Sequence, residues 1–223
     1  PYRGRGRWYI GRRVIARTRT LRADSGVVRH TAMFHQLETN KILALVKEAS
    51  VPGRTTLVAI DGLTCAGKST LVGQVTGALQ DASVVGVDDF YRPLAAEGRA
   101  ILGPKESYDR YFDWEQLLGD VLVPLSKHSR ARYRRYDWVT NGPAEWHEIE
   151  PRKVVIVEGV YSTRPELRPY FSVMVYVDAP REVRLARLLD RRYPDMSWVD
   201  HWMAVEDWYV EHVQPTKQVA LVV

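Results

Sequence analysis

The chain has 223 residues, of which 45% are apolar and 26% are charged, and these values suit one α/β domain with a sizeable core. No apolar run approaches the roughly 18 residues of a membrane span, and the N-terminal segment lacks the continuous apolar stretch of a secretory signal. The single cysteine excludes an internal disulfide and favours a reducing, cytoplasmic location.

The net charge of +5 is distributed unevenly along the chain. Residues 1–32 contain nine arginines and one acidic residue, so this segment carries +8 and the other 191 residues carry −3. Because it lacks a sustained helical or strand period, we expect a disordered arm outside the core. A tail for nucleic acid is one interpretation, and a non-native leader before Met33 is the one we favour. The remaining residues, 33–223, are predicted to form one domain.

The first predicted elements are a helix and a strand. Residues 34–49 place their apolar side chains on one helical stripe, and the Val-Pro-Gly sequence that follows is typical of a helix end. Residues 55–61 form a β-branched, apolar run that predicts a strand. A helix-compatible segment then extends to about residue 79.

The segment between this strand and helix reads G-x-x-x-x-G-K-S, the pattern of a phosphate-binding loop in the context that such a loop requires. Its backbone N–H groups and the helix N-terminus would face a phosphate. Lys68 is expected to reach the β- and γ-phosphates, and the Ser69 hydroxyl to bind Mg²⁺. We predict binding of ATP, with GTP as the alternative, through Gly62, Thr64, Cys65, Ala66, Gly67, Lys68, Ser69 and Thr70.

Apolar runs predict four further strands. The run at 153–157 is continuously apolar, as in a parallel strand that is buried on both faces. Residues 94–151 contain helical pieces and few strand signals. Because parallel sheets bind ligands at the carboxyl ends of their strands, we expect this insertion to cover the substrate. The four strands are predicted at residues 83–87, 153–157, 173–177 and 219–223.

Carboxylates at two strand ends are candidates for chemistry. Asp88 follows the second strand and is the predicted base, with Asp89 as the alternate; capping of a turn is the competing interpretation. Glu158 follows the third strand, where an unpaired carboxylate would be costly. Contact with Mg²⁺, direct or through water, would remove that cost, and pairing with an arginine is the alternative. The predicted metal site consists of Ser69, Asp88 and Glu158.

Three arginines, Arg184, Arg187 and Arg191, recur at helical spacing on one face. Such a face is either simply solvated or able to close over the γ-phosphate and neutralise developing charge. We expect a lid over residues 184–200. The apolar and aromatic residues that follow are predicted to pack a helix and not to contact a ligand: Trp198, Trp202, Val205 and Tyr209.

With these motifs in order, the chain resembles the uridine kinase family of P-loop kinases over about residues 55–223. Besides the phosphate loop, the likeness rests on five segments that are similar to family motifs. They are Asp88-Asp89-Phe90-Tyr91, Tyr111-Phe112-Asp113-Trp114, Tyr136-Asp137-Trp138, Glu158-Gly159 and Pro215-Thr216-Lys217.

The resemblance implies a P-loop kinase-type three-layer α/β sandwich. Its mainly parallel five-stranded sheet would have the order 2-3-1-4-5, with a helical lid and substrate insertion. It also implies that Asp88 acts as base, that Asp113 holds ribose hydroxyls and that Tyr136 lies near the nucleobase. Lys68, Arg187 and Arg191 would stabilise the transferred phosphoryl group. The remaining candidates for substrate binding are Tyr91, Asn141 and Arg184.

Three positions depart from the family pattern. Asn141 stands where uridine-cytidine kinases have a pyrimidine-reading histidine, and Leu188 replaces one lid arginine. Leu221 replaces an aspartate near the end of the pattern. The first two weaken the case for pyrimidine recognition, whereas the phosphoryl-transfer motifs are complete.

The sequence therefore predicts an ATP- and Mg²⁺-dependent kinase acting on a primary hydroxyl, with the 5′-hydroxyl of uridine or cytidine as the leading acceptor. The alternative acceptors are nicotinamide riboside, a phosphosugar or an antibiotic. A nucleotide switch or nucleic-acid module is the alternative of another class, although Asn40-Lys41-Ile42-Leu43 lacks the aspartate of a guanine-reading segment. The sequence leaves open whether the protein forms a homo-oligomer. A minor hypothesis is that loop amides favour the Cys65 thiolate, so that oxidation would block ATP.

Overall fold

The structure, a computed structural model, does not describe the whole chain, and side chains are described from residue 36 onward. The predicted N-terminal arm lies outside the described residues as far as residue 24. The predicted lid at 184–200 is described only in part, and the division into arm and domain stays a prediction. The described residues are 25–95, 98–99, 101–191 and 196–223.

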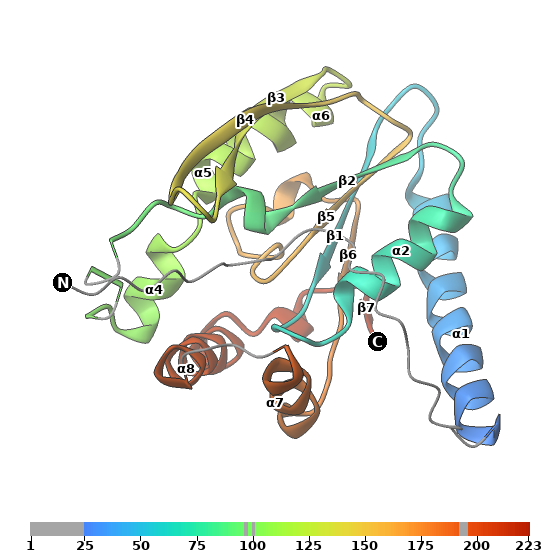
Figure 1. Cartoon of the computed structure of the whole chain (residues 1–223). Helices are drawn as coiled ribbons and strands as arrows, with labels where there is room; N and C mark the ends of the chain where they lie inside the picture. The colour runs from blue at the N-terminus through green and yellow to red at the C-terminus, as the bar shows by residue number, and fades with distance from the viewer. Residues whose placement is uncertain (1–24, 96–97, 100, 192–195) are drawn as a thin grey trace.

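The centre of the molecule is a five-stranded sheet with the order β2-β5-β1-β6-β7 (Figure 1). Each of its strand pairings is parallel, and the order confirms the predicted 2-3-1-4-5 arrangement. Glu158 proves to be the last residue of its strand and not the residue after it. The strands are β1 (Thr56–Asp61), β2 (Ala82–Gly86), β5 (Val154–Glu158), β6 (Val173–Tyr176) and β7 (Leu221–Val222).

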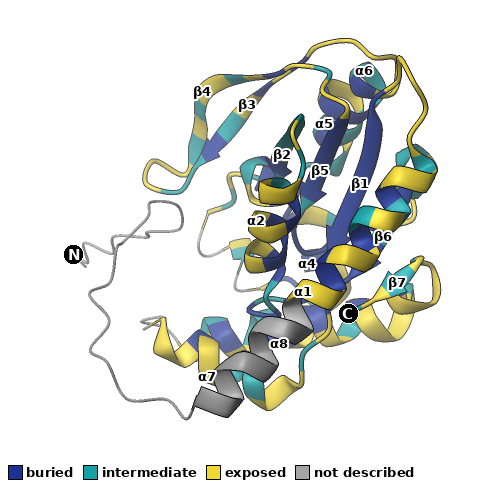
Figure 2. Ribbon diagram, turned by 90° about the vertical axis from the view of Figure 1, so that its right-hand side faces the viewer, coloured by how far each residue is buried: buried dark blue, intermediate teal, exposed yellow. Residues whose placement is uncertain are grey.

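Alternating side chains of the sheet supply two separate cores. Val58 and Ile60 of β1 pack with α1 (Ser25–Ala49) and α2 (Lys68–Ala78) on one face, whereas Leu57 belongs to the cluster on the other. Every residue of β1 is buried, as Figure 2 shows in dark blue. Burial on both faces explains the continuously apolar strands. Helix α1 begins well before the predicted residue 34, so the last part of the predicted arm is helical.

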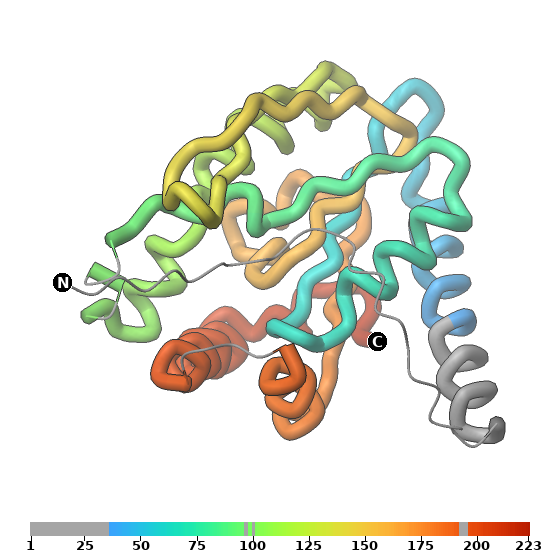
Figure 3. Tube along the Cα trace, in the orientation of Figure 1, coloured from blue at the N-terminus to red at the C-terminus, as the bar shows by residue number. Residues whose placement is uncertain are grey.

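The second face is covered by the insertion after β2, which begins with a 3₁₀ turn at Val87–Phe90. A two-stranded antiparallel hairpin within it shows that the expectation of few strands over 94–151 was wrong. The tube in Figure 3 can be followed from this hairpin back into the sheet at β5, which lies between β2 and the central strand β1. The elements are α4 (Pro104–Arg110), α5 (Trp114–Gln116), a π-helical turn (Leu117–Leu122), α6 (Val123–Ser126), β3 (Ala131–Asp137) and β4 (Gly142–Ile149).

The C-terminal part of the chain places two helices beside the phosphate loop. Helix α7 (Arg181–Asp190) follows β6, and α8 (Met196–Val213) packs against α4. Two further 3₁₀ turns lie at Arg168–Tyr170 and Pro215–Lys217. Within the described part of the chain, none of the helices has the length and apolar content that a membrane crossing requires.

Candidate active site

The phosphate loop connects β1 to α2 through two glycines with positive φ, Gly62 at +142° and Gly67 at +117°. At Gly62 a Cβ atom would lie 2.3 Å from the carbonyl oxygen of Val177, so close approach of the loop to the end of β6 requires glycine there. Gly67 stands directly before the first residue of α2. The loop therefore reaches the helix N-terminus in the arrangement that favours a bound phosphate.

The Lys68 side chain is largely buried and crosses the loop. Its Nζ donates to the carbonyl oxygens of Gly62 at 2.7 Å and Leu63 at 3.0 Å. Six of the predicted nucleotide-binding residues line a cavity of about 220 Å³, whereas Gly62 and Ala66 are not among its lining residues. The six are Thr64, Cys65, Gly67, Lys68, Ser69 and Thr70.

Asp61, which the sequence did not single out, fixes the start of the loop. Its fully buried carboxylate accepts hydrogen bonds from the amides of Gly62 at 2.6 Å and Tyr161 at 3.0 Å. The other oxygen accepts from the Thr163 amide and hydroxyl and from the hydroxyl of Tyr209 at 2.6 Å. This full set of donors compensates the buried charge.

Glu158 and Asp88, at the ends of neighbouring strands, line the same cavity as the loop. Ser69 Oγ donates to Glu158 Oε1 at 3.3 Å, and Glu158 Oε2 is buried with no partner among the described residues. Burial raises the pKa of Glu158, and the charge of Lys68 lowers it in part. The predicted alternative, pairing with an arginine, is not found among the described contacts. The orphaned oxygen suits a cation instead.

Asp88 and Asp89 have opposite surroundings. Asp88 stays open to the cavity although protein surrounds it on most sides, and this desolvation raises its pKa against the influence of Lys68. Asp89 accepts hydrogen bonds from Tyr133 Oη and Arg135 Nε, each at 2.9 Å. The structure therefore directs Asp88 to the cavity and Asp89 to the hairpin.

The walls of the cavity are strongly aromatic. Tyr91 packs its ring against Phe112 and Trp138, with centroid distances of 5.3 and 4.6 Å. Trp198 and Trp202 also line the cavity, so the prediction that they only pack a helix was wrong. Helical spacing is the same for a core and for a cavity wall, and sequence periodicity could not separate the two. Val205 and Tyr209 are buried in the core as predicted.

The predicted substrate residues at the hairpin contact one another, and they lie outside the lining of the described cavity. Asn141 Oδ1 accepts from Tyr136 Oη at 2.6 Å and from Arg99 at 2.8 Å. The Arg99 guanidinium also lies 5.0 Å above the Tyr91 ring. Asp113 caps α5 by accepting from the amide of Gln116 at 3.1 Å, and it pairs with Arg92.

The three helix-face arginines have three different environments. Arg184 is buried in an ion pair with Glu206 at 2.7 Å, which turns it away from the cavity and argues against its predicted substrate contact. Arg187 Nη1 donates to the loop carbonyls of Cys65 at 2.9 Å and Ala66 at 3.2 Å. Arg191 lines the cavity.

Leu188, which replaces a lid arginine, forms a small apolar cluster with Cys65, Val199 and Met203. Both Leu188 and Cys65 line the cavity. Burial raises the pKa of the Cys65 thiol, and the nearby charges of Arg191 and Lys68 only oppose this rise. The hypothesis of a favoured thiolate is therefore wrong.

Comparison with known proteins agrees with this geometry. The model of the Phosphoribulokinase / Uridine kinase family matches residues 57–223. A uridine kinase of Brevibacillus brevis is 28% identical over 77% of this chain and 85% of its own length. One from Clostridium novyi is 29% identical over 75% and 85%. A possible uridine kinase from Bacillus stearothermophilus has the same fold, with a TM-score of 0.67 at 22% identity over 86% of this chain and 98% of that one. The chain therefore belongs to the phosphoribulokinase and uridine kinase family and is a kinase.

Proposed function

We propose that this kinase transfers the γ-phosphoryl group of ATP, with Mg²⁺, to a primary hydroxyl of a small molecule. The preferred acceptor is the 5′-hydroxyl of a pyrimidine nucleoside. The observation that carries the proposal is the shared cavity, which is lined by Asp88, by the phosphate-loop residues Lys68 and Ser69, and by several aromatic side chains.

The donor end of the cavity suits a nucleoside triphosphate with its metal. The loop amides and Lys68 would hold the phosphates, while the Ser69 hydroxyl and the unpartnered oxygen of Glu158 fit a magnesium ion. No cluster of three or more His, Cys, Asp or Glu side chains suited to a metal occurs in the described part of the chain. A site with few protein ligands is typical of Mg²⁺, because substrate phosphates and water complete its coordination shell. When bound, the ion would neutralise phosphate charge.

At the acceptor end, Asp88 would receive or orient the hydroxyl proton. Its raised pKa brings it closer to neutral pH than an ordinary aspartate, which suits a general base. Arg191 would place positive charge beside the transferred group. Arg187 would act through the loop, because its guanidinium already donates to two loop carbonyls.

The aromatic wall supports a planar, heterocyclic acceptor. Tyr91, Phe112 and Trp138 offer rings on which a nucleobase can stack, and the relatives named above are uridine kinases. Asp113 and Tyr136 remain proposed contacts for the ribose and the base. Both belong to elements that adjoin this wall: Asp113 follows Phe112, and the Tyr136 ring lies 5.3 Å from Tyr91.

A different acceptor is the second candidate, and Arg99 favours it. This guanidinium donates a hydrogen bond to Asn141 at the end of the hairpin. The family pattern would place a pyrimidine-reading histidine at the position of Asn141. Positive charge beside Tyr91 suits an acceptor with an anionic group, such as a phosphosugar. Nicotinamide riboside and antibiotic hydroxyls belong to the same set of alternatives.

A panel of acceptors assayed by ADP release tests the proposal. Uridine and cytidine should give the highest kcat/KM, and the Asp88→Asn variant should lower acceptor-dependent ADP release by about 10²- to 10⁴-fold. A preference for a phosphosugar would replace the nucleoside assignment. If no hydroxyl acceptor raises ADP release above background, the proposed reaction is wrong.

The alternative of a nucleic-acid module depends on the arginine-rich segment. Removal of residues 1–24, which precede α1, should leave nucleoside phosphorylation unchanged. If the same deletion abolishes a salt-dependent affinity for DNA or RNA in the full chain, that second function gains support.

A further inference from the structure

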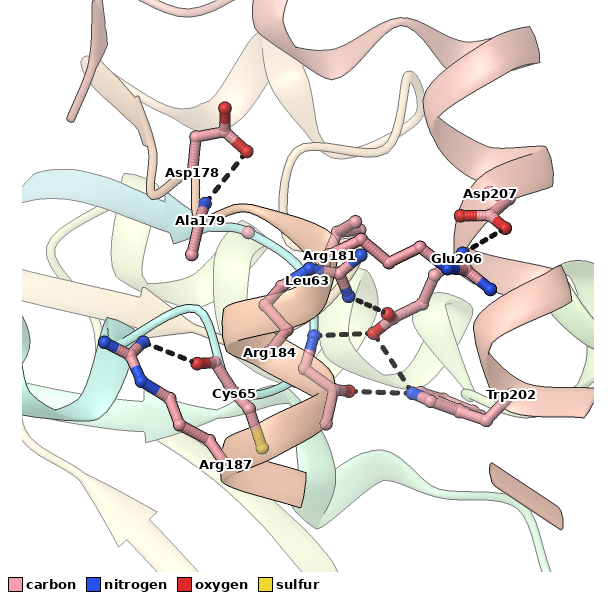
Figure 4. A network of polar contacts seen from close by, with 12 residues as sticks. Leu63, Cys65, Asp178, Ala179, Arg181, Arg184, Arg187, Trp202, Glu206 and Asp207 are labelled. Atoms are coloured by element: carbon pink, nitrogen blue, oxygen red, sulfur yellow. Dashed lines mark hydrogen bonds and ion pairs between the residues drawn. The ribbon is translucent and has the colours of Figure 1, made fainter. Parts of the chain in front are cut away.

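Glu206 of α8 is fully buried beside the phosphate loop, where it joins three elements (Figure 4). Its Oε1 accepts a hydrogen bond from the backbone amide of Thr64 at 2.6 Å and from Trp202 Nε1 at 3.1 Å. Its Oε2 accepts from Arg184 Nη1 of α7 at 2.7 Å. The family likeness gave no role to this carboxylate.

Trp202, which donates to Glu206, also contacts the side chain of Thr64. Trp202 Nε1 donates to Thr64 Oγ1 at 2.7 Å as well as to Glu206, and Thr64 lines the cavity. Because an indole N–H can only donate, the Thr64 hydroxyl must accept from it. Its own proton is therefore left to donate elsewhere, and the cavity lies beside it.

Burying the Glu206 carboxylate costs free energy of folding unless its ion pair and hydrogen bonds are kept. A buried carboxylate needs an ion pair and hydrogen bonds to offset its desolvation. Arg184 supplies the counter-charge, and the Arg184 Nε atom is itself buried with no partner among the described residues. Glu206 therefore contacts both its counter-charge on α7 and the backbone of the phosphate loop.

Trp202 extends the network toward the aromatic wall. Its ring stacks on Tyr111 with a centroid distance of 5.7 Å and an interplanar angle of 11°, and it meets Phe112 edge-on at 6.3 Å. One side chain therefore contacts both the phosphate loop and the wall assigned to the acceptor.

We propose that Glu206 is a positioning residue for nucleotide binding. It holds the Thr64 amide and, together with Trp202, directs the Thr64 hydroxyl toward the cavity, so that the loop is shaped before the phosphates arrive. The inference rests on the proposed function only in so far as the loop binds a nucleotide.

The experiment measures affinity for a non-hydrolysable ATP analogue with Mg²⁺ by calorimetry, alongside the melting temperature. Glu206→Met should weaken binding by about tenfold or more, since a hydrogen bond to a charged group is lost. The double variant Arg184→Met with Glu206→Met removes both buried charges and should recover the melting temperature while binding stays weak. In the Arg184→Met background, Glu206→Gln restores an acceptor for Thr64 and should bring affinity back toward that of the wild type.

The matched control is Asp207→Asn on the same helix. It makes the same change of charge at an exposed ion pair with Arg181 and should leave affinity unchanged. If affinity recovers together with melting temperature in the double methionine variant, Glu206 is merely structural and the proposal is overturned. Trp202→Phe keeps an aromatic ring at this position and removes the N–H donor, so a weaker affinity is expected even if the methionine variants fail to fold. An unchanged affinity in Trp202→Phe overturns the role given to the Thr64 hydroxyl.

Because no acceptor is present, these results do not depend on which hydroxyl is phosphorylated. Failure of the acceptor panel would leave the Glu206 measurements valid. Failure of the Glu206 measurements would leave the acceptor assignment untouched.

Discussion

The hydroxyl of Tyr133 on β3 donates a hydrogen bond to Asp89 Oδ2 at 2.9 Å, and this contact separates the roles of two adjacent aspartates. Arg135 pairs with the other oxygen of Asp89, so the carboxylate is held by the hairpin. Asp88, one residue earlier, faces the cavity. The antiparallel hairpin thus determines the direction of the segment that carries the proposed base.

Replacing Asp88 by Asn should leave ATP affinity nearly unchanged and lower kcat by about 10²- to 10⁴-fold, because the acceptor of the hydroxyl proton is lost. Steady-state kinetics with the best acceptor, together with calorimetric nucleotide binding, provide the measurement. Asp89→Asn is the matched control and should lower stability more than turnover. Near wild-type turnover in Asp88→Asn would reject Asp88 as the base.

Replacing Glu158 by Gln should have opposite effects on metal response and stability. The Mg²⁺ concentration for half-maximal activity should rise by about tenfold or more, since a carboxylate ligand is lost. In the presence of EDTA the melting temperature should rise, because burial raises the pKa of Glu158 and the charged form is therefore unfavourable in the fold at neutral pH. An unchanged metal dependence would remove Glu158 from the proposed site.

Replacing Gly159 by Ala should strain the backbone at this position and displace Val87 and the adjacent Asp88. Gly159 has φ +149°, and an added Cβ would lie 2.6 Å from Val87 Cβ, next to Asp88. We expect a loss of about 1–3 kcal/mol in the free energy of unfolding and a lower kcat. Gly73→Ala in α2 is the control, because it has open space and should stabilise by about 0.5–1 kcal/mol. Equal urea midpoints for the two variants would contradict this prediction.

Stability should fall in mild acid through His201. Its Nε2 lies 2.8 Å from Tyr111 Oη and 3.2 Å from Ser107 Oγ, and burial lowers its pKa from the ordinary value of 6.5. The unfolded chain therefore takes up a proton at higher pH than the folded one. The free energy of unfolding should decrease as pH falls through and below 6.5, by at most about 1.4 kcal/mol per pH unit.

Urea unfolding at several pH values checks this effect. His201→Gln should flatten the dependence, because glutamine keeps hydrogen-bonding capacity without titrating. His212→Gln, at an exposed position near the end of the same helix, is the control. The same slope in wild type and His201→Gln would place the titrating group elsewhere.

The sheet and the phosphate loop could be predicted because their signals are local. A continuously apolar strand followed by a glycine loop leaves few alternatives, and the order of the strands followed from the family resemblance. The hairpin was missed although Arg132, Tyr133 and Arg134 alternate between exposed and buried, as a strand pattern requires. Its polar outer face made the alternation easy to read as an irregular charged segment.

The missed site residues depend on contacts between distant parts of the chain. Nothing near Glu206 in the sequence indicates that its carboxylate meets the amide of Thr64, or that Arg184 turns toward it. The same limit applies to Trp202, whose helical spacing with Trp198 is compatible with either a core or a cavity wall. Tertiary packing decides such cases, and single-sequence patterns do not record it.

The hydrogen bond between Thr64 and Glu206 joins residues that are 142 positions apart. During synthesis, a growing chain therefore displays its complete phosphate loop long before α8 has been made. Contacts of such large sequence separation form late, because a long loop must first be closed. The contact that we propose to shape the phosphate loop can therefore form only after α8 has been synthesised.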